Sequence, residues 1–178
     1  MNKSPLSTLS VEIVQMDGKN PLSKFNCGEP EVDRWAQRSA HKLHSKQRNK
    51  VYILREAGGE TPLAFFSLSL TLHDNGKLLR QEDRDGWRYG APFTYLDWLG
   101  VARSRQGIGL GKLLLSKAME LTAEIHQIAP VYGLALRSLN KNTTSYYEKL
   151  GFAIAPGEVP EGNPLMILPI FTILALID

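Results

Sequence analysis

Two periodicities of apolar residues alternate along this chain, and each predicts a different element. Apolar and polar residues alternate loosely from Leu9 to Met16, which is typical of a strand. Apolar residues recur at helical spacing from Pro30 to about His44, and Pro30 with its acidic neighbours suits a first helical turn. Further strands are expected over 51–54, 62–72, 93–101, 131–136, from 152 onward and over 165–177, and further helices over 111–128 and 140–150.

The pattern also indicates how these elements connect. A Gly58-Gly59-Glu60 turn joins segments 51–54 and 62–72, which predicts an antiparallel hairpin. The most hydrophobic run, Leu165 to Ile177, is too short for a bilayer, which needs roughly 20 residues, and Pro169 interrupts it. We expect it to form a buried strand that closes the sheet. The loop-like stretches are expected inside one domain, so a single domain over residues 1–178 is predicted.

Composition narrows the class of protein only slightly. Apolar residues make up 43% of the chain and charged residues 22%, as in ordinary globular proteins. The net charge of +3 suits an anionic cofactor or RNA and proves neither. A single cysteine, Cys27, excludes an internal disulfide, and the polar segment 1–5 has no apolar stretch of signal-peptide length. We expect a cytoplasmic protein without a membrane partner, and no residue grouping has the spacing of metal ligands.

Charge is concentrated in two places. The loop over residues 74–89 is dense in both signs and either covers a substrate site or is mobile padding. The outer face of the first predicted helix is basic, which indicates either a solvated surface or a contact surface for a polyanion. The basic residues in and just after this helix are Arg34, Arg38, Lys42, Lys46, Arg48 and Lys50.

The chemistry of the chain centres on residues 106–112, between a predicted strand and a predicted helix. Three glycines at alternate positions leave the backbone unshielded, so successive N–H groups can converge where the helix begins. Such a helix start is a ready anion site, although a tight turn without a ligand remains the alternative. A nucleotide triphosphate loop is excluded because Leu113 follows Lys112, and the dinucleotide-binding glycine spacing is also absent.

The spacing Gln106-x-x-Gly109-x-Gly111 resembles the acetyl-coenzyme A pyrophosphate loop of the GNAT superfamily of N-acetyltransferases. Farther along, Asn140 precedes Tyr147 and a Glu-Lys-Leu-Gly-Phe run, which is similar to the other signature segment of that superfamily. The resemblance implies an α/β (α+β) GNAT fold. Its mixed, mostly antiparallel sheet of six to seven strands would be flanked by helices and split between the strand before the glycine loop and the strand after it.

The resemblance also implies acetyl-coenzyme A as acyl donor and Tyr147 as the general acid that protonates the departing thiolate. Asp97, a carboxylate in an apolar strand, is either the partner of an arginine or the general base for an amine. Catalysis by positioning alone would need no base. The backbone of Leu99, Gly100 and Val101 would align the pantetheine arm. The other expected cofactor-binding residues are Gln106, Gly107, Ile108, Gly109, Leu110, Gly111, Lys112, Asn140 and Tyr147.

The acceptor is left open as a primary amine. Residues Phe25 to Trp35 resemble the opening of the TacT-type toxins, a GNAT branch that acetylates the amino group of aminoacyl-tRNA and is paired with a ribbon-helix-helix antitoxin. That branch usually carries an arginine in the strand before the loop, where this chain has Trp98. One alternative is therefore such a toxin, with tRNA on the basic first helix, an antitoxin partner and a homodimeric assembly. A non-catalytic coenzyme A-binding or interaction protein is another, against which Tyr147 argues.

Overall fold

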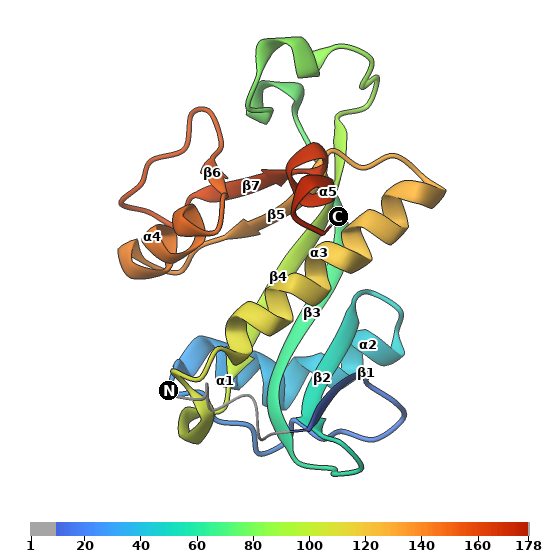
Figure 1. Cartoon of the computed structure of the whole chain (residues 1–178), viewed down its shortest axis with the longest axis vertical. Coiled ribbons are helices and arrows are strands. Elements are labelled where there is room, and N and C mark those ends of the chain that lie inside the picture. Colours follow the sequence, from blue (N-terminus) through green and yellow to red (C-terminus); the bar gives the residue numbers. More distant parts are fainter. Residues whose placement is uncertain (1–9, 178) are drawn as a thin grey trace, which may run out of the picture. The chain divides into compact units, whose positions relative to one another are not determined.

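Seven strands form a mixed sheet in the order β1-β2-β3-β4-β5-β7-β6 (Figure 1). The structure is a computed structural model that describes residues 10–177. These residues fall into two compact units, a first one with the chain up to Ser69 and Asp97–Lys117, and a second one with Leu70–Leu96 and the chain from Ala118. The strands are β1 (Val11–Gln15), β2 (Lys50–Glu56), β3 (Pro62–His73), β4 (Ala91–Val101), β5 (Gly133–Arg137), β6 (Ala153–Ile154) and β7 (Leu165–Pro169).

The first unit confirms the strand expected near residue 11 and the predicted hairpin. β1 and β2 pair antiparallel, and so do β2 and β3, with Ile53 opposite Phe65. The predicted helix begins at Pro30 as expected, but it is α-helical only at its ends. Leu9, at the start of the expected first strand, lies outside the described residues. The helical stretch consists of α1 (Pro30–Trp35), the π-helical η2 (Ala36–Ala40) and α2 (His41–Ser45).

The second unit holds the parallel part of the sheet. β4 pairs parallel with β5 from Phe93 to Leu96, β5 pairs antiparallel with β7, and β7 pairs antiparallel with β6. A side chain at Gly133 would lie 2.1 Å from the carbonyl oxygen of Leu168, so only glycine fits this register. The predicted helices are present as α3 (Leu110–Ile128) and α4 (Lys141–Lys149).

The expectation that Leu165 to Ile177 forms one buried strand is wrong in its second half. β7 ends at Pro169, and Ile170–Ile177 form helix α5, where only Ile173 is fully buried. A continuous apolar run does not distinguish a strand from a helix, and proline is tolerated where a helix begins. α5 is apolar but short, and no helix within residues 10–177 is long and apolar enough to cross a membrane.

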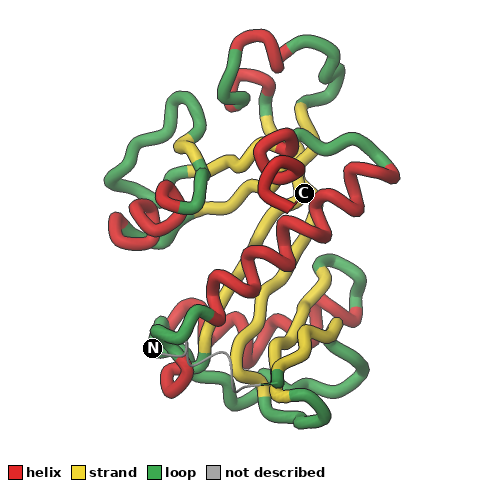
Figure 2. Tube along the Cα trace, viewed as in Figure 1, coloured by secondary structure: helices red, strands yellow, loops and turns green. Residues whose placement is uncertain are grey.

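The loop between β3 and β4 has its own structure, because the short 3-10 helices η3 (Asn75–Lys77) and η4 (Gln81–Arg84) interrupt it (Figure 2). The side-chain amide of Asn75 donates to the carbonyl oxygens of Arg84 (3.1 Å) and Trp87 (3.0 Å). Leu78 in this loop is fully buried in the core of the second unit. Asn75 and Leu78 therefore anchor this loop within the second unit, and a role over a substrate site stays a prediction.

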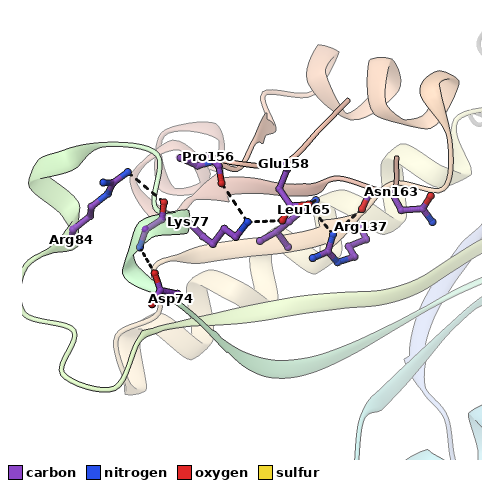
Figure 3. Close-up of polar contacts among 9 residues, drawn as sticks. Asp74, Lys77, Arg84, Arg137, Pro156, Glu158, Asn163 and Leu165 are labelled. Atoms are coloured by element: carbon purple, nitrogen blue, oxygen red, sulfur yellow. Dashed lines mark hydrogen bonds and ion pairs between the residues drawn. The ribbon is translucent and has the colours of Figure 1, made fainter. Parts of the chain in front are cut away.

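One carboxylate joins three segments of the second unit (Figure 3). Glu158 accepts hydrogen bonds from Lys77 Nζ (2.8 Å), from Arg137 Nη1 (3.0 Å) and from the backbone N–H of Leu165 (3.2 Å). These donors, Lys77 first, lower the pKa of Glu158 to about 2. The loop between β6 and β7 is thereby tied to β5 and to η3.

Candidate active site

The glycine loop of the first unit presents backbone donors without acceptors. A short 3-10 helix, η5 (Arg103–Arg105), follows β4, and the loop then leads into α3. Gly107 (φ 79°) and Gly109 (φ 93°) adopt left-handed conformations that residues with a side chain rarely take. Within residues 10–177, no group accepts a hydrogen bond from the backbone N–H groups of 107–112, and the first N–H with an acceptor is that of Leu113. The loop thus has the free amides that an anion site needs.

Gln106 has a bracing role that the sequence did not reveal. Its side-chain amide donates to the carbonyl oxygens of Cys27 (2.7 Å) and Val101 (3.0 Å), so it ties the loop to the end of β4. The Cys27 segment is itself fixed by Asp33, whose carboxylate accepts from the backbone N–H groups of Cys27 and Gly28. A direct contact between Gln106 and a cofactor stays a prediction, while its side chain positions the loop.

The last residues of β4 combine tight packing with a free backbone edge. A side chain at Gly100 would meet Phe65, Phe25 and Val32 at 2.9–3.0 Å, which requires glycine at this position. The pairing with β5 stops at Leu96, so the corresponding edge of β4 from Asp97 onward has no strand partner among the described residues. Such an edge can accept an extended ligand as an added strand.

Asp97 is the only carboxylate in β4, and its two oxygens differ. Oδ1 accepts a hydrogen bond from Ser69 Oγ at 3.0 Å, whereas Oδ2 is buried without any partner among residues 10–177. Burial, only partly offset by the Ser69 bond, raises the pKa of Asp97 to about 6. No arginine in the described part of the chain pairs with it, so the salt-bridge alternative finds no support. A carboxylate that titrates near neutrality is suited to base chemistry.

The alternation of side chains along β4 is interrupted next to Asp97. Phe65 and Ser69 lie on one face of β3, and Phe65 stacks on Trp35 of α1, so this is the face that α1 covers. Asp97 bonds to Ser69 and Trp98 stacks on Trp35, which puts two consecutive residues of β4 on that face. Regular alternation would point these two side chains to opposite faces of the strand, so β4 is irregular at this point. A bulge-like irregularity of this kind re-aims a side chain, often beside an active site.

In the second unit, Tyr147 carries a hydroxyl without a hydrogen-bond partner among the described residues. Its ring lies edge-on to Tyr146 (centroids 5.4 Å apart) and to Phe152 (5.6 Å). Burial, reinforced by the neighbouring Tyr146, raises the pKa of Tyr147 to about 12. The phenol therefore keeps its proton at neutral pH, which is what a general acid requires.

Asn140 begins α4 as its N-cap. Its Oδ1 accepts from the backbone N–H of Thr143 (3.1 Å), and Thr143 Oγ1 accepts from the backbone N–H of Asn140 (3.0 Å). This reciprocal pair is a capping box. Asn140 is a residue type that favours the N-cap, whereas the part of Thr143 in the capping box is seen only in the structure. Contact between Asn140 and a cofactor stays a prediction.

The basic face of the first helix forms a continuous stripe. Arg34, Arg38, Lys42 and Lys46 are all exposed, and none has an ion-pair partner among the described residues. In an α-helix of about 3.6 residues per turn, residues four apart drift around the axis. The wider turn of the π-helical η2 reverses that drift. The four cations therefore stay on one side of the helical stretch.

Comparison with known proteins agrees with the sequence motifs. Residues 19–152 match the Acetyltransferase (GNAT) family. The probable toxin TacT of Sinorhizobium fredii (strain NBRC 101917 / NGR234) is 27% identical over 170 residues, which cover 89% of this chain and 90% of that protein. The structure of AtaT complexed with acetyl-methionyl-tRNAfMet has a TM-score of 0.84 and 22% identity, and covers 95% of this chain and 100% of its own. That of AtaTR bound with AcCoA has a TM-score of 0.80 and 25% identity, and covers 95% and 99%.

These matches confirm the resemblance drawn from the glycine loop and the Asn140–Phe152 segment, together with the mixed seven-stranded sheet of the fold. They also confirm acetyl-coenzyme A as the cofactor, since it is the acyl donor of the family. The chain belongs to the GNAT acetyltransferase family and is an acetyl-coenzyme A-dependent acyltransferase.

Proposed function

We propose that this protein transfers an acetyl group to the amino group of aminoacyl-tRNA. The observation that carries this choice of acceptor is the stripe of four exposed cations along α1, η2 and α2 up to the C-cap Lys46, which have no ion-pair partners among the described residues. Unpaired cations spaced along one side of a helix suit a phosphate backbone. The likeness to a probable toxin TacT and to an AtaT structure that holds acetyl-methionyl-tRNAfMet supports the same acceptor.

The free amides of Gly107 to Lys112 would hold the diphosphate of acetyl-coenzyme A, with the exposed Lys112 adding positive charge. The backbone of Leu99, Gly100 and Val101 would align the pantetheine arm along the open edge of β4. Acetyl-coenzyme A supplies an activated acyl group as a thioester. Fixing this donor beside the acceptor accounts for much of the rate enhancement that we expect.

Two side chains would move protons in this reaction. Asp97, whose Oδ2 has no partner within residues 10–177, would take a proton from the acceptor ammonium, directly or through a water molecule. Tyr147, protonated at neutral pH, would give its proton to the departing thiolate. The first delivers a neutral amine for attack, and the second neutralises the leaving group. The two roles need opposite protonation states, and burial sets both pKa values accordingly.

The partners follow from the proposed acceptor. A ribbon-helix-helix antitoxin would be the regulatory partner, because the relative with 27% identity is a probable toxin and Phe25–Trp35 resemble the opening of that toxin branch. Expression of this chain alone should arrest growth, because acetylated aminoacyl-tRNA is lost to translation. Co-expression with a ribbon-helix-helix antitoxin should restore growth and yield a co-purifying complex. Unrestored growth and separate elution would contradict the antitoxin proposal alone.

The test of the acceptor is an acetylation screen with labelled acetyl-coenzyme A. The substrates are a set of aminoacyl-tRNAs, the same tRNAs without their amino acids, and free primary amines. We expect label on the amino group of charged tRNA and none on uncharged tRNA. Transfer to small amines alone would replace tRNA with a metabolite as acceptor. Release of no thiol with any amine would favour the alternative of a coenzyme A-binding protein without catalysis.

A further inference from the structure

Three aromatic rings form a row in the first unit that leads from the core toward the surface. The Phe65 ring lies 5.9 Å from that of Trp35, and the Trp35 ring lies 5.6 Å from that of Trp98, with interplanar angles of 14° and 19°. Phe65 is fully buried, whereas Trp35 and Trp98 are half-buried. Trp98 ends the row, because its ring stacks on one neighbour only among the described residues.

The hydrogen-bonding capacity of Trp98 is not satisfied, as that of a core tryptophan would be. Its indole N–H has no hydrogen-bond acceptor within residues 10–177. The N–H of Trp87, in contrast, donates to the carbonyl oxygen of Asp83 at 3.0 Å. Buried tryptophans usually find such a partner, so a half-buried indole without one offers both a ring face and a donor to a ligand.

The neighbour of this indole is the carboxylate proposed as base. The interrupted alternation of β4 brings Asp97 and Trp98 to the same face of the strand, the face that α1 covers. In a regular strand they would serve opposite faces. When an amine binds with its nitrogen at Asp97, the group attached to that nitrogen therefore lies toward Trp98.

We infer that Trp98 determines which acceptor is used, by stacking on a planar π-system next to the amine that is acetylated. The inference deepens the proposed function and rests on it for the reaction at Asp97. Two sources of the planar group fit this chemistry, an aromatic side chain of the aminoacyl residue and the terminal base of the RNA. Either one would extend the row by one more ring.

The test compares the wild type with Trp98→Leu, which keeps an apolar side chain, and Trp98→Phe, which keeps a ring. The acceptors are tRNAs charged with phenylalanine, tyrosine, leucine or glycine, and the free amines phenethylamine and butylamine. If the aminoacyl side chain stacks, Trp98→Leu should raise KM about tenfold for the aromatic acceptors and less than twofold for the others. If the base stacks, KM should rise about equally for every charged tRNA and for neither free amine. Trp98→Phe should restore most of the loss in both cases.

The kcat with saturating acceptor should change little, which separates a binding role from a general loss of folding. Dissociation constants for acetyl-coenzyme A serve as the folding control. If Trp98→Leu does not fold, saturable quenching of tryptophan fluorescence is compared between wild type and Trp98→Phe. Quenching by phenethylamine tests stacking of the aminoacyl side chain, and quenching by glycyl-tRNA tests stacking of the terminal base. Equal KM values in wild type and Trp98→Leu for all acceptors would overturn the inference. Failure of the proposed acceptor would appear instead as wild type acting on phenethylamine and on no charged tRNA.

Discussion

Two regions of this protein are dense in charge in the sequence, and the structure uses their charges differently. On the stripe of Arg34, Arg38, Lys42 and Lys46, each cation is exposed and unpaired within the described part of the chain. In the loop between β3 and β4, most charges are used internally. Lys77 bonds to Glu158, both Nε and Nη2 of Arg80 donate to Asp83, and Arg84 donates to Gln81 and to two carbonyl oxygens.

The difference teaches that charge density does not by itself indicate an interaction surface, because charges that pair with one another are not available to a ligand. The same distinction separates other polar groups of the molecule. Gln106, Asn140 and Glu158 are engaged in holding segments together. The backbone amides of 107–112 and the Tyr147 hydroxyl make no hydrogen bond to any described residue. We expect engaged groups to affect stability and free groups to affect activity.

The largest effect is expected for Tyr147→Phe, which removes the free hydroxyl and keeps the ring. Because a general acid contributes about 10²- to 10⁴-fold, kcat should fall by that factor while KM for acetyl-coenzyme A changes little. Thiol release measures both parameters. The melting temperature should stay close to that of the wild type, since the hydroxyl bonds to no described residue.

Tyr146→Phe is the matched control, because Tyr146 lies next in the sequence, contacts the Tyr147 ring and is 41% exposed. This variant should retain nearly full activity. Equal loss in the two variants, or none in either, would remove Tyr147 from the mechanism.

Asp97→Asn should lower the rate of transfer about 10²-fold at pH 7.5. In the wild type, kcat/KM for the acceptor should rise with pH through about 6, where Asp97 loses its proton, and this rise should vanish in the variant. Profiles of rate against pH measure both. A wild-type profile that is flat between pH 5 and 7 would exclude Asp97 as the base.

The same variant should be more stable than the wild type at high pH. The folded state raises the pKa of Asp97, so it favours the protonated form, and stability is lost as pH rises through about 6. Removing the charge should add about 1 to 2 kcal/mol at pH 8, after allowance for partial exposure, and nothing below pH 4. Urea unfolding at the two pH values tests this. A variant that is less stable at pH 8 would mean that the carboxylate stabilises the fold instead.

The sequence predicted the position of the glycine loop and of the Asn140 helix better than it predicted how they are held. The type and spacing of the glycines, of Asn140 and of Tyr147 are enough to predict the loop and the helix that begins at Asn140. The bracing by Gln106 could not, because it depends on Cys27, which is distant in the sequence. Neither the π-helical turn nor the interruption at Asp97 changes the apolar pattern, and α5 was missed because an apolar run is ambiguous.

Two double variants of equal charge test the comparison of the stripe with the loop directly. Arg38→Gln with Lys42→Gln should weaken tRNA binding about tenfold. The plot of log K against log salt should become less steep by about 1.5, because each lost phosphate contact removes about 0.7 to 0.9 from its steepness. Arg84→Gln with Arg88→Gln should leave that slope unchanged. Filter binding at several salt concentrations measures it. Equal slopes for both variants would mean that net charge alone governs binding.

An effect on stability alone, with none on activity, is expected where a group is fully engaged. Glu158→Gln should lower the free energy of unfolding at pH 7 by about 1 to 2 kcal/mol, because it weakens the charge-assisted bonds from Lys77 and Arg137. The pKa of Glu158 is lowered to about 2, so its contribution is present above the usual pKa of 4.5 and is lost as pH falls from there toward 2.

The matched control is Glu161→Gln, because Glu161 is an exposed residue of the same loop without an ion pair to any described residue. Urea unfolding should give the wild-type value for Glu161→Gln at pH 7, and at pH 2.5 the difference between Glu158→Gln and wild type should shrink. A loss of transfer activity without loss of stability would instead give Glu158 a functional role and would break the rule that engaged groups serve the fold.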